Sequence, residues 1–508
     1  MNNLEEQNLV SKTLKTTFFD FVSLILTRGG SFVFTIILAR LLLPELFGAY
    51  NLVLSIVLVF VAIADFGVNS AVLKYVSERY SLKKTKAKSY LIYLFKIKLI
   101  LIIGIIFLIL IMSHFFAISI FKKPILFYPL IFSTLYVLLT SFKDFFTSIL
   151  FSLRKASKVP FMEISFQLSR IIFVVLAIHI FNFSFHVSGV ILSLVASSFI
   201  SIIIFFIIIN KERKIFNSKT QPINKKGLFK YLKYSGIAGL TILIFGSVDT
   251  LMLGLFVGES FIGFYRVALS IVINLSSLFL FSRVLLPVFS NTNSQQFKRG
   301  FGKVFRYYLI FTIPLTIGLI VLSKYVIFVL FGQEYLPSSK ILYFLSFITI
   351  LFPLSSLYNS IFQARGQTKI LAILTILALG INIFLNFIFI KLLMSRGTIS
   401  ILLGVAFATI FSRFINIHFL YKKAKKDFGL HMPKKTLLIS FVSGGIMGFF
   451  LFLINIFLDM NLFFGILEII FGAGIYFGLL YLFKEIKEED ILILNIIFTK
   501  FKQRIKNN

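Results

Sequence analysis

The stretch from Ile191 to Ile209 reads ILSLVASSFISIIIFFIII and decides the fold class, because every residue in it except four serines is apolar. A helix needs roughly 20 apolar residues to cross about 30 Å of hydrocarbon. Leu99–Met112 with its flanks and Ile370–Ile390 are similar runs. Barrel strands alternate apolar and polar residues, whereas these runs are continuously apolar. The sequence therefore predicts an all-α polytopic membrane protein.

The composition supports this prediction. The chain has 508 residues, of which 58% are hydrophobic and only 14% charged, which is more apolar surface than one water-soluble core can hide. Phe18–Leu43 is too long for the apolar region of a secretory signal, so we expect it to be retained as the first helix. The chain has no cysteine and shows no paired histidine spacing, so we expect no disulfide, no metal site and no cofactor.

The basic residues fall in every second gap between apolar runs. This alternation predicts an even number of helices, about fourteen, with both termini in the cytoplasm and the basic loops on the cytoplasmic side of a plasma membrane. We assign the net charge of +33 to these loops and not to nucleic-acid binding. The predicted segments are a cytoplasmic N-terminus (1–13), a first six-helix bundle (14–210), a basic cytoplasmic linker (211–233), a second six-helix bundle (234–421), a basic cytoplasmic loop (422–435), two extra helices (436–484) and a cytoplasmic amphipathic tail (485–508).

An internal repeat appears when the chain is shifted by 215 residues, which lays Val33–Val57 on Val248–Val272 without a gap. Leu54–Val57 then recurs identically as Leu269–Val272, and Gly48 and Tyr50 recur as Gly263 and Tyr265. The shift pairs each helix with the one six helices later in the chain. Because six is an even number, the paired helices cross the membrane in the same direction. We therefore predict two parallel six-helix repeats, an arrangement that usually places the substrate site between the halves.

Several short motifs are spread over about residues 14 to 430: Ala39–Tyr50 (ARLLLPELFGAY), Ala64–Gly67 (ADFG), Ser247–Gly254 (SVDTLMLG), Gly263–Ala268 (GFYRVA), Leu286–Val288 (LPV) and Gln363–Lys369 (QARGQTK). Together they resemble the polysaccharide and O-antigen flippases, which belong to the multidrug/oligosaccharidyl-lipid/polysaccharide exporter superfamily. The resemblance implies a lipid-linked oligosaccharide substrate and alternating access. The lipid II branch tends to carry an Arg-Asp pair in its first helix, whereas Arg28 is followed by Gly29 and Gly30, which weighs against a peptidoglycan precursor.

The physics of moving such a substrate points to arginines within the apolar runs. Each sugar hydroxyl costs several kcal/mol in hydrocarbon without a partner, so a hydrated path is needed. A diphosphate linker needs fixed cations along it, and the planar guanidinium group suits phosphate. The predicted substrate-binding residues are Arg28, Arg170, Arg266, Arg283 and Arg413, of which Arg28 and Arg283 lie best placed, deep in long apolar helices at the predicted seam.

Each of the other three arginines also has a structural interpretation. Arg266 lies near the outer end of its helix and could snorkel to the membrane surface. Arg170 shares a helical face with Glu163 and Gln167, a polar stripe that could pair with the helix predicted over 125–152. Arg413 could face the inner membrane interface near Asn416.

Acidic residues inside the apolar runs leave a second mechanism open. A buried carboxylate can bind a proton or Na⁺, or it can pair with an arginine or with backbone N–H groups freed at a kink. These residues, for which we predict ion coupling or structural pairing, are Asp20, Asp65, Asp144, Glu163 and Asp249.

We predict a flippase that moves a polyprenyl-diphosphate-linked oligosaccharide from the cytoplasmic to the outer leaflet. The alternative is a Na⁺- or H⁺-coupled exporter of small cationic or amphipathic molecules, and a third function is a non-transporting partner in an envelope assembly complex. A catalytic function is disfavoured because no nucleophile with a base is visible and every outer gap has about a dozen residues or fewer. The expected partners are the lipid-linked oligosaccharide, membrane lipids and the glycan polymerase or glycosyltransferases of the same assembly, with one chain forming the transport unit.

Overall fold

The computed structural model describes residues 2–78, 84–210, 221–279, 294–457, 462–487 and 490, with side chains from Leu26 onward except at 84–86, 294, 368 and 462. Within these ranges the chain is helical apart from turns and short connections, and it contains no strand. The long helices are α1 (Asn2–Asp65), α4 (Lys84–His114), α5 (Phe127–Ser152), α6 (Val159–Ile180), α7 (His186–Asn210), α8 (Lys225–Phe256), α9 (Glu259–Ser277), α11 (Ser294–Val321), α14 (Ile348–Ala364), α15 (Thr368–Leu393), α16 (Thr398–Phe428), α17 (Lys434–Phe457) and α18 (Leu462–Leu482). The shorter ones are α2 (Val68–Ala71), α12 (Ser323–Phe331), α13 (Ser338–Leu345) and two π-helical segments, η1 (Val72–Val76) and η2 (Phe115–Ile120).

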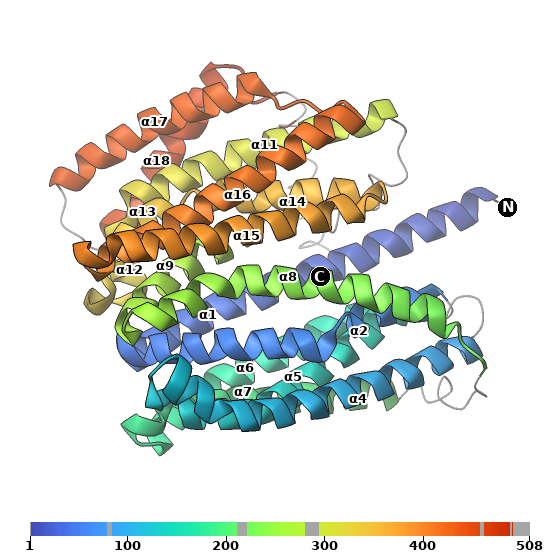
Figure 1. Ribbon diagram of the computed structural model, residues 1–508. Coiled ribbons are helices and arrows are strands. Elements are labelled where there is room, and N and C mark those ends of the chain that lie inside the picture. The colour runs from blue at the N-terminus through green and yellow to red at the C-terminus, as the bar shows by residue number, and fades with distance from the viewer. Residues whose placement is uncertain are drawn as a thin grey trace, which may run out of the picture.

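Thirteen candidate membrane spans lie within the described residues, and the all-α polytopic prediction is confirmed. The first span, Leu26–Asp65, has 40 residues, about 60 Å if straight and twice the thickness of the hydrocarbon. It is not straight, because Leu43 has φ 58° and ψ 171° next to Pro44. Figure 1 shows the chain running across the molecule from the N-terminus and returning toward α2, so α1 consists of two arms. The count of fourteen helices in two parallel repeats stays a prediction.

Three helix ends have local causes, and two of them differ from the predicted segment bounds. Helix α1 ends just before Gly67, whose φ of 81° is left-handed and whose added Cβ would lie 2.2 Å from Ser235 Oγ. Helix α8 begins at Lys225, inside the predicted linker, because Asn224 Oδ1 caps it by accepting a 3.0 Å hydrogen bond from Gly227 N. Helix α16 continues to Phe428, where the left-handed Gly429 ends it.

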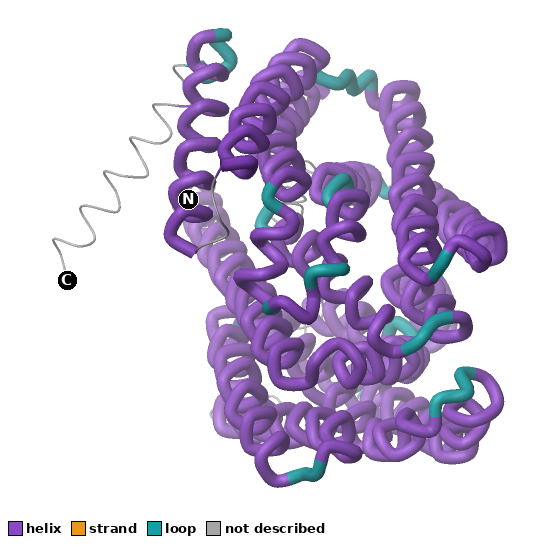
Figure 2. Tube along the Cα trace, turned by 90° about the vertical axis from the view of Figure 1, so that its left-hand side faces the viewer, coloured by secondary structure: helices purple, strands orange, loops and turns teal. Residues whose placement is uncertain are grey.

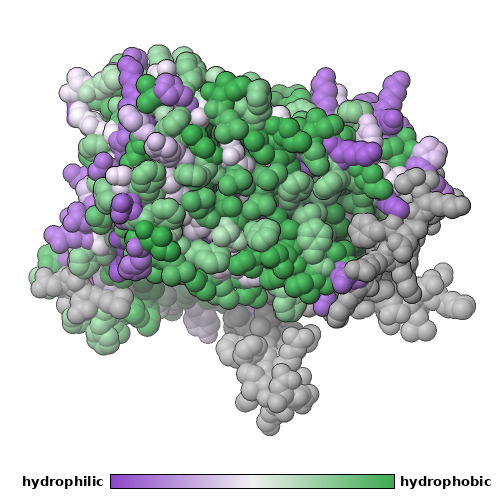
Figure 3. All heavy atoms as spheres, turned by 90° about the horizontal axis from the view of Figure 1, so that it is seen from below, coloured by the Kyte–Doolittle hydropathy of each residue, from purple (hydrophilic) through white to green (hydrophobic). Residues whose placement is uncertain are grey.

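The surface has the form expected of a membrane-spanning bundle. In Figure 3 apolar residues cover the middle of the molecule and hydrophilic residues gather at its two ends. Figure 2 looks at the bundle from the left-hand side of Figure 1, where short loops join the helices. The helices therefore run from one hydrophilic end to the other, as crossing a bilayer requires.

The largest buried core is shared by the two halves of the chain and lies toward one end of the molecule. One cluster joins residues of the first half, such as Leu38 and Leu52, to residues of the second half, such as Leu253 and Val272. At the end where α4 begins and α7 ends, a second core consists of the first half together with Leu228 and Leu232 at the start of α8. At the end where α11 begins and α16 ends, the second half of the chain has a separate core. These two separate cores lie toward the face that carries the linker 211–233 and the predicted basic loops.

Candidate functional site

The polar stripe of α6 faces the first arm of α1. Arg170 Nη2 donates to Ser31 Oγ at 3.1 Å, and Gln167 Nε2 donates to the Thr27 backbone oxygen at 3.4 Å. Thr27 Oγ1 in turn donates to Glu163 Oε2 at 3.2 Å. The hydrogen bonds of the stripe thus go to α1 and not to α5, the helix that covers 125–152. Gly30 makes this approach possible, because an added Cβ there would lie 2.8 Å from the Gln167 side chain.

Arg170 is held between aromatic rings without filling its hydrogen-bonding capacity. Its Cζ lies 4.3 Å from the centre of the Phe34 ring and 5.3 Å from that of Phe166. On the other side of this cluster, Lys143 Nζ lies 4.1 Å from the Phe166 ring centre and 3.6 Å from Asp144 Oδ1. Arg170 Nε is buried and has no hydrogen-bond partner within the described residues. A guanidinium group kept in this way is available to an anionic ligand.

In the second half, Asp249 on α8 forms the centre of a buried hydrogen-bonded group. Its carboxylate accepts from Tyr265 Oη (2.8 Å), Asn386 Nδ2 (2.8 Å) and Thr409 Oγ1 (2.7 Å), which belong to α9, α15 and α16. Asn386 Nδ2 also reaches Asn382 Oδ1 at 3.4 Å. Asn386 Oδ1 is buried without a hydrogen-bond partner within the described residues. The group thus offers one carboxylate and one unoccupied amide oxygen, ligands that a hard cation prefers.

Arg413 on α16 lies close to this group. Its Cζ is 4.6 Å from the centre of the Phe245 ring and 5.8 Å from that of Phe352. Its Nε, like that of Arg170, is buried and unpartnered within the described part of the chain. Arg170 in the first half and Arg413 in the second are thus each stacked on phenylalanine with a donor left over. Arg365, which follows α14 and lies 4.3 Å from the Phe297 ring centre, shows the same pattern.

The remaining predicted residues have more varied surroundings. Asp65 Oδ1 accepts from Lys98 Nζ at 2.8 Å and from Asn69 N at 3.2 Å, beyond the Gly67 break, so its contacts are those of an ion pair and a kink cap. Arg266 Nε donates to Asn51 Oδ1 at 3.0 Å, across the two halves. Arg28 is partly buried on the first arm of α1. The predictions for Arg283 and for the side chain of Asp20 lie outside the described residues.

Four residues of these groups were missed by sequence reasoning. Lys98 and Lys143 are cations within apolar helices, and the search for arginines alone passed over them. Asn386 and Thr409 are neutral residues with no spacing that links them to Asp249 in the sequence. Among the described residues no group of three His, Cys, Asp or Glu side chains could hold a metal ion, so a cation at Asp249 would need amide and hydroxyl ligands.

Comparison with known proteins places this geometry in context. A family model described as "Polysaccharide biosynthesis protein" matches residues 13–293, more than half of the chain. The chain is 28% identical over 326 residues to the uncharacterized membrane protein MJ1068 of Methanocaldococcus jannaschii, covering 60% of this chain and 61% of that protein. It is 24% identical over 285 residues to the probable low-salt glycan biosynthesis flippase Agl15 of Haloferax volcanii, covering 54% and 58%. The chain thus spans less than two thirds of either relative's length.

The fold also resembles a solved structure. The lipid II flippase MurJ in its inward closed conformation superposes with a TM-score of 0.67 at 21% identity, over 93% of this chain and 99% of that one. At this identity the likeness concerns the arrangement of the helices and not the substrate.

Proposed function

This chain belongs to the polysaccharide biosynthesis protein family, and on that premise we propose that it is a flippase for lipid-linked oligosaccharides and not an enzyme. It moves a polyprenyl-diphosphate-linked oligosaccharide from the cytoplasmic to the outer leaflet of the plasma membrane by alternating access. Both termini lie in the cytoplasm, on the side of the basic loops. The name of the relative Agl15, a probable glycan biosynthesis flippase, supports this substrate class.

The observation that carries the proposal is the pair of incompletely hydrogen-bonded arginines, Arg170 and Arg413. Each lies in a candidate membrane span and has a buried Nε without a partner among the described residues. A permanent cation is costly at such depth, and an unpaired donor adds to the cost. An anionic diphosphate that passes between the two halves relieves both costs, with one arginine on each side of its path.

The distribution of the cores supports the direction of transport. The two halves share a core at one end. At the end of the basic loops there are two distinct cores, and the start of α8 is packed into that of the first half. A molecule that is closed toward the outside and divided toward the cytoplasm is ready to receive a substrate made in the cytoplasm. The membrane potential then favours export of the anion, by about 2.3 kcal/mol per charge at 100 mV.

Flipping in reconstituted vesicles tests the proposal. The probe is a polyprenyl-diphosphate oligosaccharide with a fluorescent sugar, and the measurement is the rate at which the dye becomes accessible to an impermeant quencher. We expect Arg170→Gln and Arg413→Gln each to slow flipping by about ten- to a hundredfold, the value of a charge-assisted hydrogen bond. The matched control is Arg396→Gln, at an exposed position between α15 and α16.

Three outcomes would contradict the proposal. Full activity in both variants would remove the assignment of the arginines. A wild-type protein that leaves the labelled lipid in place but accumulates an organic cation in response to a Na⁺ or proton gradient would favour the exporter alternative. A protein inert toward both probes would favour the non-transporting role in an assembly complex.

A separate observation supports ion coupling. It concerns the source of energy for transport and not the identity of the substrate. Asp249 and the unpartnered Asn386 Oδ1 supply two oxygen ligands within the membrane. We propose that this group binds Na⁺ and couples the ion to the movement of the second half. Such a site is compatible with either substrate class.

A further inference from the structure

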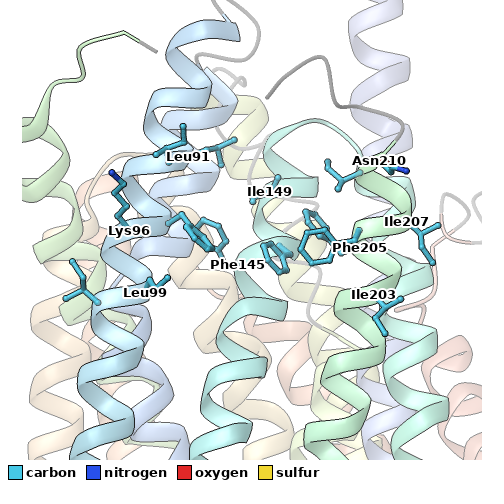
Figure 4. A pocket seen from close by; sticks show the side chains of 15 residues that line it. Leu91, Lys96, Leu99, Phe145, Ile149, Ile203, Phe205, Ile207 and Asn210 are labelled. Carbon is cyan, nitrogen blue, oxygen red and sulfur yellow. The ribbon is translucent and has the colours of Figure 1, made fainter. Parts of the chain in front are cut away.

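A groove of about 1120 Å³ lies on the first half of the chain, away from the residues described above. It is bounded by α4, α5 and α7, and all of its 15 lining residues except Lys96 and Asn210 are apolar. Figure 4 shows Leu91 and Asn210 near one end and Leu99 and Ile203 near the other. Because α7 ends at Asn210, the first of these ends lies toward the linker and the membrane face of the basic loops.

The groove opens to the lipid phase and not to the interior of the protein. Ile100, Ile203, Phe206 and Ile207 all line it and all have exposed side chains, between 43% and 69%. Its wall contains Phe146 stacked on Phe205, with ring centres 4.4 Å apart. A rigid aromatic wall with no hydrogen-bonding groups does not hold ordered water and is suited to a hydrocarbon chain.

Lys96 gives the groove its one charge. Its side chain is exposed and makes no hydrogen bond or ion pair within the described residues. In Figure 4 the ammonium group is turned toward the Leu91 end, the direction in which a lysine snorkels to reach lipid headgroups. An apolar groove with a single cation at headgroup level matches an amphiphile with an apolar chain and one negative charge.

We propose that this groove is a binding site for an anionic glycerophospholipid of the leaflet on the basic-loop side. The acyl chain lies along the phenylalanines, and the phosphodiester contacts Lys96, with the Asn210 amide as a further donor. A phosphodiester carries one negative charge, which one lysine balances, whereas a polyprenyl diphosphate carries more. The groove is therefore assigned to a resident membrane lipid and not to the tail of the transported substrate.

Lipid retention measured by native mass spectrometry tests this assignment on the full-length protein. The probes are phosphatidylglycerol and phosphatidylcholine with identical acyl chains, offered in equal amounts. We expect about fivefold preferential retention of phosphatidylglycerol, the effect of one lysine near an anionic headgroup. Lys96→Gln removes this preference, whereas Lys369→Gln, at an exposed position outside the groove, keeps it.

A second pair of variants separates the groove from the charge. Ile203→Trp fills the groove and lowers retention of both lipids, whereas Ile172→Trp, at an exposed position on α6, does not. Equal retention of the two lipids by the wild type, or unchanged retention in Lys96→Gln or Ile203→Trp, overturns the proposal. Displacement of phosphatidylglycerol by a polyprenyl phosphate also overturns it, because the groove would then hold the substrate tail.

Discussion

Arg266 Nε donates a 3.0 Å hydrogen bond to Asn51 Oδ1, and the two residues are 215 positions apart. This is the shift that superposes the two halves of the sequence, so a residue of one half contacts its own counterpart in the other. The glycines one helical turn away behave reciprocally. An added Cβ on Gly48 would meet Glu259 O at 1.8 Å, and one on Gly263 would meet Pro44 O at 2.3 Å, where Pro44 and Glu259 are again counterparts.

Reciprocal contacts of this kind are produced by a two-fold axis. If a residue of the first half contacts a residue of the second, the axis makes the counterparts of these two residues contact each other as well. Counterparts that touch each other lie at the axis itself. The second arm of α1 and α9 therefore cross where an axis between parallel repeats would pass, which supports the predicted duplication. The seam they form belongs to the end of the molecule where the two halves share one core.

The Asn51→Leu variant tests the energetic role of the Arg266 contact. Leucine removes the acceptor and leaves a charged donor unpaired at the seam, so we expect a loss of about 1–2 kcal/mol in the free energy of unfolding. The measurement is thermal unfolding of the purified protein in detergent. The control is Asn274→Leu, because Asn274 donates only to Ser270 O of its own helix. A loss of equal size in both variants would show that the seam contact has no special weight.

Substitution at the crossing glycines should open the seam. In Gly48→Ala or Gly263→Ala the new methyl group collides with a backbone carbonyl, which cannot move as a side chain would. The chain has no cysteine, so a single Leu46→Cys, at a position that is 1% exposed, reports on opening through labelling by an impermeant maleimide. We expect labelling to rise several-fold in both glycine variants and to stay low in Gly246→Ala, which has open space around it.

The features that could be predicted from the sequence are those that depend on composition, on the length of the apolar runs and on the internal repeat. Continuous apolar runs such as Ile191–Ile209 predicted membrane helices, and the recurrence of Gly48 as Gly263 predicted a duplication. The place of these two glycines at the contact between the halves was not predicted. The Leu43 kink was predicted only as a boundary between two helices. Its backbone reversal next to Pro44 depends on packing against the second half, which local sequence does not encode.

The candidate site was less predictable, because its contacts join helices distant in the chain. The polar stripe ending at Arg170 was visible, but its partner was not, since Ser31 is 139 residues away. Asp249 was identified as a membrane carboxylate, whereas its ligand-like neighbours Asn386 and Thr409 have no signature of their own. Hydropathy identifies which residues are costly in a bilayer but not which of them meet.

The segment after α18 is attached to α11 by an ion pair whose strength should depend on pH. Asp490 contacts the Arg306 guanidinium and the Tyr307 hydroxyl. Burial alone raises the pKa of Asp490, but the hydrogen bonds from Tyr307 and Arg306 outweigh it and hold the pKa below its ordinary value. A lowered folded pKa means that the pair stabilises the protein above the unfolded value of about 3.9 and loses this effect as pH falls through the folded value.

We therefore expect Asp490→Asn to lower stability at pH 7 by about 1 kcal/mol and to have no effect at a pH below the folded pKa. Thermal unfolding of both proteins across this range is the measurement. Asp427→Asn is the matched control, because Asp427 pairs with the more exposed Lys423 one turn away on α16, and such pairs contribute little. A stability difference that persists unchanged in acid would contradict the assignment to the carboxylate.

Na⁺ binding at Asp249 is the prediction that separates a coupled from an uncoupled transporter. If the carboxylate and Asn386 Oδ1 bind Na⁺ only in the folded protein, NaCl stabilises the wild type over KCl at equal ionic strength, by about 1.4 kcal/mol at ten times the Kd. Asp249→Asn and Asn386→Leu remove this difference, because each removes an oxygen ligand. Asp65→Asn is the control: it breaks the ion pair with Lys98 in the first half and lowers stability in both salts, but it keeps the Na⁺ effect. A wild type that unfolds identically in the two salts, or an Asp249→Asn variant that still responds to Na⁺, would leave the buried carboxylate with a purely structural role in joining α8 to α9, α15 and α16.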